Sequence, residues 1–344
     1  MKLFRYAMFI LVFTFSILSA EDLPKYKMID LGVFGTDQSN AIAINEKGQV
    51  LGSCEEGGCR YIFLWDELNG LKLIDLPEGC NYWELKLNNN GQIAGVGYLD
   101  SSLKAFLWDQ NLGFWELETS KDEIEIAAFN DKGQVLGRIG DEIFLWDHGK
   151  KTDMTGMFRE MIPGKWDSFQ AVALNNHGHL VLNANTTPQD IWVQRSFLWK
   201  DGSFKMILPE KGWETSTQVV AFDDDGNMVI ALYNRRGGEG GQYFISQARN
   251  IFAPCQRVDS IRNGLPIAKD CLPGKLKKDG QGKSYFSNGI QIKKLFKDEF
   301  PYYNFPNSTV IRDQNSKGYV VGQIDTMFPG SHAFLAIPQL TNEK

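Results

Sequence analysis

Few residues in this sequence have the types and spacing that metal or acid–base chemistry needs. Only four histidines occur, and His177 and His179 form the one close pair, without further ligands at metal-site spacing. The run from Asp223 to Asn227 (DDDGN) resembles the start of a calcium loop, but the later positions and the distal glutamate of an EF-hand are missing. We expect neither a metal nor a cofactor, and we interpret both segments as solvated turns.

Local catalytic signatures are also missing from the sequence. There is no Gly-x-Ser-x-Gly elbow, no Gly-rich phosphate loop with its lysine, and no His-Glu-x-x-His pair. Catalysis would therefore require acids and bases that come together from segments far apart in the chain.

Five cysteines are available for disulfide bonds in an exported chain. Cys255 and Cys271 are equidistant from Asn263, which forms a hairpin signal with Gly264. We predict that the two cysteines face each other across the first and second strands of a degenerate structural repeat over about residues 246–295. Cys54 and Cys59 flank Glu-Glu-Gly-Gly, and we predict a local bridge between them. The fifth cysteine would remain an unpaired loop thiol.

The elements that would position any site come from an internal repeat. Each copy has a strand ending in Asn or Asp, a tight turn closed by Gly, a short apolar strand, and an aromatic strand that reads Phe-Leu-Trp in its clearest form. Six copies are recognised, and they begin at residues 45, 88, 130, 175, 223 and 315. Their aromatic strands contain Phe63, Phe106, Phe144, Phe197, Phe244 and Phe334.

The spacing of the copies predicts one more, degenerate blade. The turn glycines of the first five copies are 42 to 48 residues apart, which is the length of one four-stranded propeller blade. Gly226 and Gly318 are 92 residues apart, which leaves room for a degenerate sixth blade over about residues 246–295. We therefore predict that residues 21–344 form one all-β domain, a seven-bladed β-propeller of four-stranded antiparallel blades.

The two ends of the ring are predicted to meet in one blade. A fourth strand follows the other aromatic strands, as in Leu71–Leu76 (LKLIDL), but none follows Phe334. Tyr26–Leu31 (YKMIDL) is nearly a copy of that fourth strand. We expect it to pair into the last blade and to close the ring, which removes an exposed sheet edge.

The repeat resembles the HAF repeat of bacterial exported proteins, roughly DLG-x-S-A-x-x-IN-x-x-GQVVG followed by HAFLW. His332–Leu335 shows the naming motif, and Ile29–Gly32 with Ser39–Gly52 matches the opening half. The resemblance covers about residues 26–245 and 310–336. It implies a secreted or envelope propeller and brings no defined activity. The Trp-Asp pairs also resemble WD40 propellers, but the Gly-His element of that family is missing.

Strand order separates the two faces of the predicted ring. The turns after the first and third strands of each blade share one face and are mostly short and uniform. The opposite loops vary in length and carry aromatic residues, which offer a large contact area with a polar handle. We predict that this face binds a partner, unless its rings merely cap the contacts between blades. The candidates are Tyr82, Trp83, Trp166, Trp192, Arg195, Trp213, Tyr302 and Tyr303.

The predicted axial channel contributes one further candidate residue. The inner strands carry small–large pairs such as Ala43-Ile44 and Ala128-Phe129, which fit a crowded axis. Lys86 takes the small position in the second copy, and we expect its side chain to extend into a wet channel.

The first twenty residues predict export. Lys2 and Arg5 precede an apolar run over Met8–Leu18, and Ser19-Ala20 provides a small-residue cleavage site. The run is shorter than the roughly 20 residues that span a bilayer, so we expect no transmembrane span in the mature chain. Removing two positive charges changes the net charge from −6 to −8, and no basic stripe is present, so we expect no nucleic-acid partner. We expect a monomer that is secreted, periplasmic or held in the cell envelope.

These observations favour a non-enzymatic interaction module that binds a protein or a glycan. Two alternatives stay open: a hydrolase or lyase acting on carbohydrate at the central funnel, and a structural envelope protein. Carboxylates with shifted pKa values in a deep funnel would favour the enzyme, and a lattice or oligomer without a soluble ligand would favour the structural protein. Fold alone does not separate the three.

Overall fold

A computed structural model confirms the all-β prediction. Its strands are short, and they are joined by turns with glycine at positive φ, as Gly48 (φ 86°) and Gly91 (φ 80°) show. The structure describes residues 25–33, 38–56, 59–77, 81–99, 102–187, 193–207, 215–234, 239–246, 251–255, 260–262, 265–267, 276–278, 284–286, 309–325 and 330–339.

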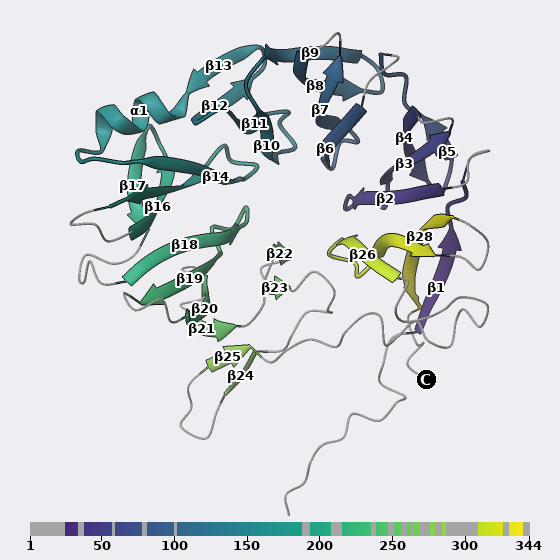
Figure 1. Ribbon diagram of the computed structural model, residues 1–344. Helices are drawn as coiled ribbons and strands as arrows, with labels where there is room; N and C mark the ends of the chain where they lie inside the picture. Colours follow the sequence, from purple (N-terminus) through teal and green to yellow (C-terminus); the bar gives the residue numbers. More distant parts are fainter. Residues whose placement is uncertain are drawn as a thin grey trace, which may run out of the picture.

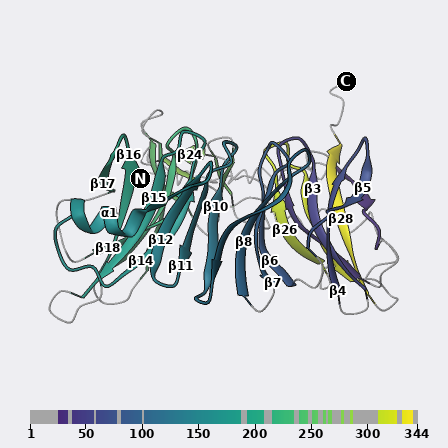
Figure 2. The same ribbon diagram turned by 90° about the horizontal axis from the view of Figure 1, so that it is seen from above.

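Six four-stranded antiparallel sheets, which we call blades, surround a common axis in the described part of the chain (Figures 1 and 2). In the first five blades the strands follow one another in sequence order, with the first strand nearest the axis. The arrangement is a β-propeller. The first blade comprises β2 (Gln38–Ile44), β3 (Val50–Glu56), β4 (Cys59–Asp66) and β5 (Gly70–Leu73); the second comprises β6 (Asn81–Leu87), β7 (Ile93–Leu99), β8 (Ser102–Asp109) and β9 (Gly113–Ser120).

The next three blades repeat the same order. The third blade comprises β10 (Ile124–Phe129), β11 (Val135–Ile139), β12 (Glu142–Asp147) and β13 (Lys150–Asp153). The fourth comprises β14 (Ser168–Leu174), β15 (Leu180–Thr186), β16 (Val193–Lys200) and β17 (Ser203–Ile207). The fifth comprises β18 (Thr215–Phe222), β19 (Met228–Asn234), β20 (Glu239–Ser246) and β21 (Ile251–Cys255).

The last blade confirms the predicted closure of the ring. It contains β26 (Thr309–Gln314), β27 (Val320–Asp325) and β28 (Ser331–Gln339), and its outer strand is β1 (Lys25–Asp30) from the other end of the chain. β1 runs antiparallel to β28, with Ile29 opposite Leu335. His332 Nδ1 lies 2.9 Å from Asp30 Oδ2 and adds a side-chain contact across this seam.

Residues between the fifth and last blades form two short hairpins in the described part of the chain. β22 (Ser260–Arg262) pairs with β23 (Leu265–Ile267) on either side of Asn263-Gly264, which confirms that predicted hairpin. β24 (Leu276–Lys278) pairs with β25 (Ser284–Phe286). β22 contacts β18 and β19, and the β22–β23 hairpin lies between β18 and β26 in Figure 1. A complete four-stranded blade at this place, the predicted sixth of seven, remains a prediction.

The structure corrects the prediction for Cys255. Cys255 lies in β21, opposite Gln242, so it belongs to the outer strand of the fifth blade and not to the first strand of a sixth. Both Cys255 and Cys54 are buried free thiols, so the structure does not show the expected disulfides. In the β3–β4 hairpin, Cys54 is opposite Tyr61, while Cys59 is opposite Glu56. Cys271 lies outside the described residues.

In the described part of the chain, one helix interrupts the all-β pattern, and it was not predicted. Helix α1 (Met154–Met161) lies between the third and fourth blades, and the Asp153 side chain caps it by accepting the N–H of Gly156 at 2.8 Å. The fully buried Phe158 ring meets Phe169 and Phe197 edge-on. The helix therefore packs into the junction between the third and fourth blades. At eight residues, this described helix is too short to cross a membrane.

A glycine–phenylalanine pair explains part of the repeat. In the first blade Gly52 is opposite Phe63, and a Cβ atom on Gly52 would lie 2.1 Å from Cζ of Phe63. The second blade pairs Gly95 with Phe106 in the same register. In these two blades the buried ring occupies the space of the missing side chain, so a larger residue at either glycine would collide with it.

The turn asparagines link neighbouring blades. Asn45 Oδ1 accepts the N–H groups of Lys47 (3.1 Å) and Gln49 (2.9 Å), which fixes the turn. Its Nδ2 donates to the backbone oxygen of Asn88 in the next blade at 3.0 Å. The same bond joins Asn88 to Asn130, Asn130 to Asn175, and Asn175 to Asp223. We call this series the asparagine belt.

Candidate functional site

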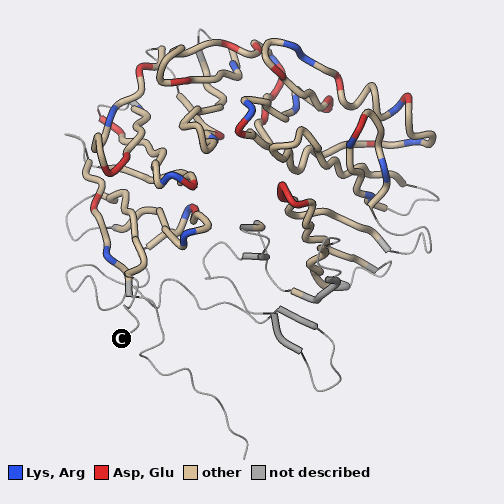
Figure 3. The backbone as a smooth tube through the Cα atoms, turned by 180° about the vertical axis from the view of Figure 1, so that it is seen from behind, with Lys and Arg blue, Asp and Glu red and all other residues tan. Residues whose placement is uncertain are grey.

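A cavity of about 400 Å³ lies against the inner strands of four consecutive blades. This volume falls within the roughly 300–1,000 Å³ of small-molecule sites. Figure 3 shows that residues of both charges gather where the inner strands turn around the axis. We call this space the axial cavity. Its polar residues are Glu84, Lys86, Glu125, Gln170 and Gln218, and its apolar residues are Ile126, Ala127, Ala171, Val172, Val219 and Val220.

Three of the inner strands that line the axial cavity, β10, β14 and β18, have a β-bulge at the same place. In β10, β14 and β18 the register shifts just after Ile126, Ala171 and Val219. The residues immediately before them are Glu125, Gln170 and Gln218. Three blades therefore place a polar side chain at one equivalent position, next to a buried apolar residue.

Glu84 reaches the axial cavity because the bulge in β6 is different. Glu84 adopts φ 53°, a left-handed conformation that non-glycine residues seldom take. The equivalent residues Ile126 and Val219 are buried, whereas Glu84 is exposed and the next residue, Leu85, is buried in its place. Leu85 packs where a side chain on Gly95 would otherwise stand. A non-glycine residue held at positive φ often marks a functional position.

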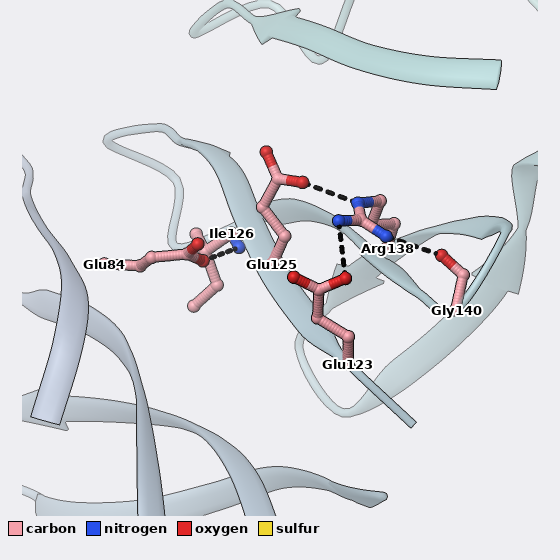
Figure 4. Close-up of polar contacts among 6 residues, drawn as sticks. All are labelled: Glu84, Glu123, Glu125, Ile126, Arg138 and Gly140. Carbon is pink, nitrogen blue, oxygen red and sulfur yellow. Dashed lines mark hydrogen bonds and ion pairs between the residues drawn. The ribbon is translucent and has the colours of Figure 1, made fainter. Parts of the chain in front are cut away.

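The Glu84 carboxylate contacts the neighbouring blade (Figure 4). Its Oε2 accepts the backbone N–H of Ile126 at 2.9 Å. The pKa of Glu84 is raised, chiefly because partial burial disfavours the charged form, and the nearby Glu125 raises it further. The Ile126 hydrogen bond, Lys86 and Arg138 oppose this rise. Glu84 is therefore a carboxyl group that takes up a proton more readily than an ordinary glutamate.

Glu125, in contrast, is held as an ion pair. Arg138 Nε donates to Glu125 Oε2 at 2.5 Å, and the guanidinium also donates to Glu123 Oε2 at 3.0 Å and to Gly140 O at 2.8 Å (Figure 4). The bonds to Glu125 and Glu123 raise the pKa of Arg138, and all three bonds fix the orientation of its guanidinium. The axial cavity thus holds two carboxylates in different environments.

A buried polar network positions Gln170. Asn183, fully buried in β15, donates from Nδ2 to Gln170 Oε1 at 3.3 Å. Asn183 Oδ1 accepts the Ser196 hydroxyl at 2.6 Å, and its Nδ2 also reaches the backbone oxygen of Val219 at 3.3 Å. The network joins the fourth and fifth blades behind the axial cavity and orients the side-chain amide of Gln170.

The sequence-predicted aromatic residues occupy other places. Tyr82 is buried at 5% exposure, and its hydroxyl donates to Pro77 O at 2.7 Å. Trp83 is half-buried between the second and third blades. Trp166 packs edge-on against Phe158. These three rings pack within or between blades, as the capping alternative expects.

The remaining predicted candidates are also dispersed or lie outside the described part of the chain. Arg195 is 3% exposed in β16, where its Nη1 donates to Gln194 O at 3.0 Å and burial lowers its pKa. The structure therefore does not bring the described candidates into one site. Lys86, however, lines the axial cavity. Four candidates lie outside the described residues: Trp192, Trp213, Tyr302 and Tyr303.

Sequence reasoning missed four of the five polar residues of the axial cavity. Alignment of the inner strands carries a signal for one of them, Glu84. Glu84 stands where the other described copies have Ala41, Ile126, Ala171, Val219 and Ile311, and it is the one charged residue in that series. The positive φ that turns it toward the axis is a tertiary feature that spacing does not show.

The described residues do not include a metal-binding cluster of three or more His, Cys, Asp or Glu side chains. The rings of His177 and His179 are 5.8 Å apart, and burial lowers the pKa of His179. In the acidic turn, Asp223 accepts hydrogen bonds from Asn227, and Asp224 accepts them from Asn176. Those carboxylates therefore serve turn structure and blade contacts.

A second, larger hollow of about 720 Å³ lies on the outer rim between the first and second blades. Its lining includes the exposed Leu73 and Leu112. Asp109, on its wall, already accepts the N–H of Asn111 at 2.8 Å and Nε2 of Gln92 at 3.1 Å. The axial cavity is the better candidate, because acidic, basic and amide groups from separate blades meet there.

No protein-family model and no curated protein matches the sequence. Among solved structures, the chain is similar to a streptogramin B lyase at 12% identity and a TM-score of 0.48, covering 92% of this chain and 98% of that one. It is also similar to virginiamycin B lyase from Staphylococcus aureus at 12% identity and a TM-score of 0.49, covering 91% and 100%. It is similar to TolB from Acinetobacter baumannii at 13% identity and a TM-score of 0.35, covering 59% of this chain and 53% of that one. This level of similarity carries no argument about function.

Proposed function

We propose that the protein is an exported β-propeller that binds a glycan in the axial cavity. The observation that carries the proposal is the convergence of five polar side chains from β6, β10, β14 and β18 on one cavity of about 400 Å³. Sugar hydroxyls both donate and accept hydrogen bonds. Carboxylates can accept from them, and amide nitrogens can donate to them. A recessed polar cavity suits a small ligand better than a protein, whose binding is usually dominated by aromatic anchors.

Export is the second part of the proposal. It is supported by the charged, apolar and small-residue order of residues 1–20 and by the resemblance of the repeat to HAF-repeat proteins. Expression of the full chain in bacteria, followed by fractionation and N-terminal sequencing, tests this part. Recovery in the exported fraction with a new terminus near Glu21 is expected, whereas retention of Met1 in the cytosol would contradict it.

Binding is tested by a glycan array with the mature chain, residues 21–344. A double variant, Gln170→Leu with Gln218→Leu, removes two amides of the axial cavity and should abolish capture of any glycan that the mature chain retains. The matched control is Asn40→Leu, which removes an amide at the equivalent position of β2, outside the cavity lining. Equal loss in the control, or no loss in the double variant, would contradict binding in the axial cavity.

A second function is favoured by one specific observation, the different environments of Glu84 and Glu125. Cleavage of glycosidic bonds by acid and base uses two carboxyl groups in different environments, and here one has a raised pKa while the other is ion-paired with Arg138. A turnover screen of glycans retained on the array distinguishes this function from binding alone. Turnover that Glu84→Gln abolishes while capture persists would establish a hydrolase or lyase.

A further inference from the structure

We propose that the axial cavity selects a uronic acid, with the sugar carboxylate bound by Lys86, Gln170 and Gln218 and a hydroxyl bound by Glu84. This inference rests on the proposed glycan-binding function and names the ligand class. It follows from the hydrogen-bonding capacity that the protein leaves unused around the cavity.

In both Gln170 and Gln218 the amide oxygen accepts a hydrogen bond from the protein, and the amide nitrogen does not donate one to the described residues. Gln170 Oε1 accepts from Asn183 Nδ2 at 3.3 Å, and Gln218 Oε1 accepts from the Tyr233 hydroxyl at 3.3 Å. Within the described part of the chain, neither Nε2 group makes a hydrogen bond. Both side chains line the axial cavity, so their nitrogens are available as donors to a ligand.

Lys86 adds a charged donor from another strand. Its side chain is half-buried in β6 and lines the axial cavity. Among the described residues, Lys86 forms neither an ion pair nor a hydrogen bond, whereas Lys104 pairs with Glu116 at 2.8 Å. A half-buried ammonium without a direct partner favours a ligand that brings a negative charge.

The carboxylates of the cavity limit how much charge the ligand can carry. Glu125 is neutralised by Arg138, but Glu84 places a further negative charge near Lys86. A phosphate or sulfate dianion would face stronger repulsion from these carboxylates than a carboxylate monoanion would. The one-charge ligand is therefore favoured.

Glu84 provides the complementary acceptor for a hydroxyl group. Its Oε2 is bonded to the N–H of Ile126, and Oε1 has no hydrogen-bond partner within the described part of the chain. An acceptor beside three donors fits a molecule that carries a carboxylate and hydroxyl groups on one small frame. A hexuronic acid has this composition, and the cavity of about 400 Å³ is in the size range for one sugar.

The test is titration calorimetry on the mature chain, residues 21–344, with four probes. D-Glucuronate and D-galacturonate are compared with D-glucose and D-galactose, which have the same ring hydroxyls and no carboxylate. We expect at least one uronate to bind about tenfold more tightly than its neutral counterpart, because hydrogen bonds to a charged group are stronger. Lys86→Met should remove this preference while leaving neutral-sugar binding in place.

The matched control is Lys47→Met, which removes the same charge from an exposed turn of the first blade. Circular dichroism establishes that each variant is folded. Equal affinity for uronate and neutral sugar would overturn the uronate inference and keep the proposed glycan binding. Binding of inorganic phosphate as tight as that of the uronate would also overturn the inference. Failure of all four sugars here, together with a blank glycan array, would overturn both.

Discussion

The side-chain amide of Asn315 donates a hydrogen bond of 3.0 Å to the backbone oxygen of Asn45, although 270 residues separate the two in the sequence. The bond continues the asparagine belt across the seam where the ends of the ring meet. β1 closes the last blade at its outer edge, and this bond joins the last and first blades near the axis. The two ends of the ring are therefore joined both at the outer edge and near the axis.

Asn130 is the member of the belt whose loss should cost most stability. It is 4% exposed, its Oδ1 accepts the N–H groups of Lys132 and Gln134, and its Nδ2 donates to Asn175 O at 2.9 Å. Asn130→Ala should lower the free energy of unfolding by about 2–4 kcal/mol. Urea denaturation measures this change. Lys132→Ala, at the exposed neighbour, should change it by less than about 0.5 kcal/mol, and similar effects of both variants would contradict the prediction.

Asp223 reverses the direction of a side-chain hydrogen bond within the turn of the fifth blade. Where Asn45 donates to Gln49 Oε1 at 2.8 Å, Asp223 instead accepts from Asn227 Nδ2 at 2.7 Å. Burial raises the pKa of Asp223, and Asp225 and Asp224 add to the rise. Asp223→Asn should therefore stabilise the protein by about 1 kcal/mol at neutral pH.

The stabilisation by Asp223→Asn should depend on pH with a defined sign. Because the folded pKa of Asp223 lies above its unfolded value, protonation favours the folded state, and this contribution is lost as the pH rises through the folded pKa. The advantage of the asparagine variant should shrink as the pH falls toward about 4. Asp225→Asn removes the same charge from an exposed position. An equal, pH-independent gain in that control would contradict the explanation by burial.

Glu84 should make uronate binding stronger at mildly acidic pH. The groups that face it are Lys86 on its own strand, Glu125 on β10 and Arg138 on β11. Its raised pKa means that protonation begins at a higher pH than in an ordinary glutamate and removes a charge that repels the ligand. The sugar carboxylate itself stays ionised above about pH 4.5. We expect the affinity for the bound uronate to rise several-fold between about pH 8 and about pH 5.5.

Glu84→Gln provides the control for this pH dependence, since glutamine keeps the size of the side chain and does not titrate. Its affinity for the uronate should be high at both pH values. A variant that retains the full pH dependence would show that another group is responsible, and an affinity of the unsubstituted protein that falls with pH would contradict the sign of the prediction.

Tyr26 should be essential to closure by β1. Its side chain is 1% exposed and packs with Ile311 and Phe334 in the last blade. Tyr26→Ala should reduce the free energy of unfolding by about 3–5 kcal/mol, whereas Lys27→Ala, at the exposed next residue, should have little effect. Burial raises the pKa of Tyr26 to about 12. Stability should therefore fall as the pH rises from about 10 toward 12, and Tyr26→Phe should weaken that dependence.

The repeat made most of the fold predictable. Asn at the turn, Gly at its close and Phe in the third strand each have a local physical role that recurs in successive copies, as Asn45, Gly48 and Phe63 show. The closing strand was predictable because Tyr26–Leu31 nearly copies another fourth strand. Helix α1 was not, because eight residues between two blades give too little periodicity to recognise.

The candidate site was less predictable than the fold. Lys86 departs from the alanine of four other copies, as at Ala43 and Ala128, so its type alone drew attention. Glu84 also departs from its series, but its direction depends on φ 53° and on Leu85 taking the buried place. Aromatic type did not point to the axial cavity, because Tyr82 and Trp166 pack within and between blades.

Every hydrogen bond of the asparagine belt points the same way around the ring, from one blade to the next. This shared direction allows one copy of the repeat to replace another. Each donor is a side chain of one copy, while the acceptor, as in Asn45 to Asn88, is a backbone carbonyl of the next. A backbone carbonyl is present whatever residue the next copy carries at its turn position. A copy with asparagine at that position can therefore precede any other copy. Duplication or exchange of such a unit would leave this joint intact. A copy with aspartate at this place, as at Asp223, lacks the donor, so a unit placed after it must be held by other contacts.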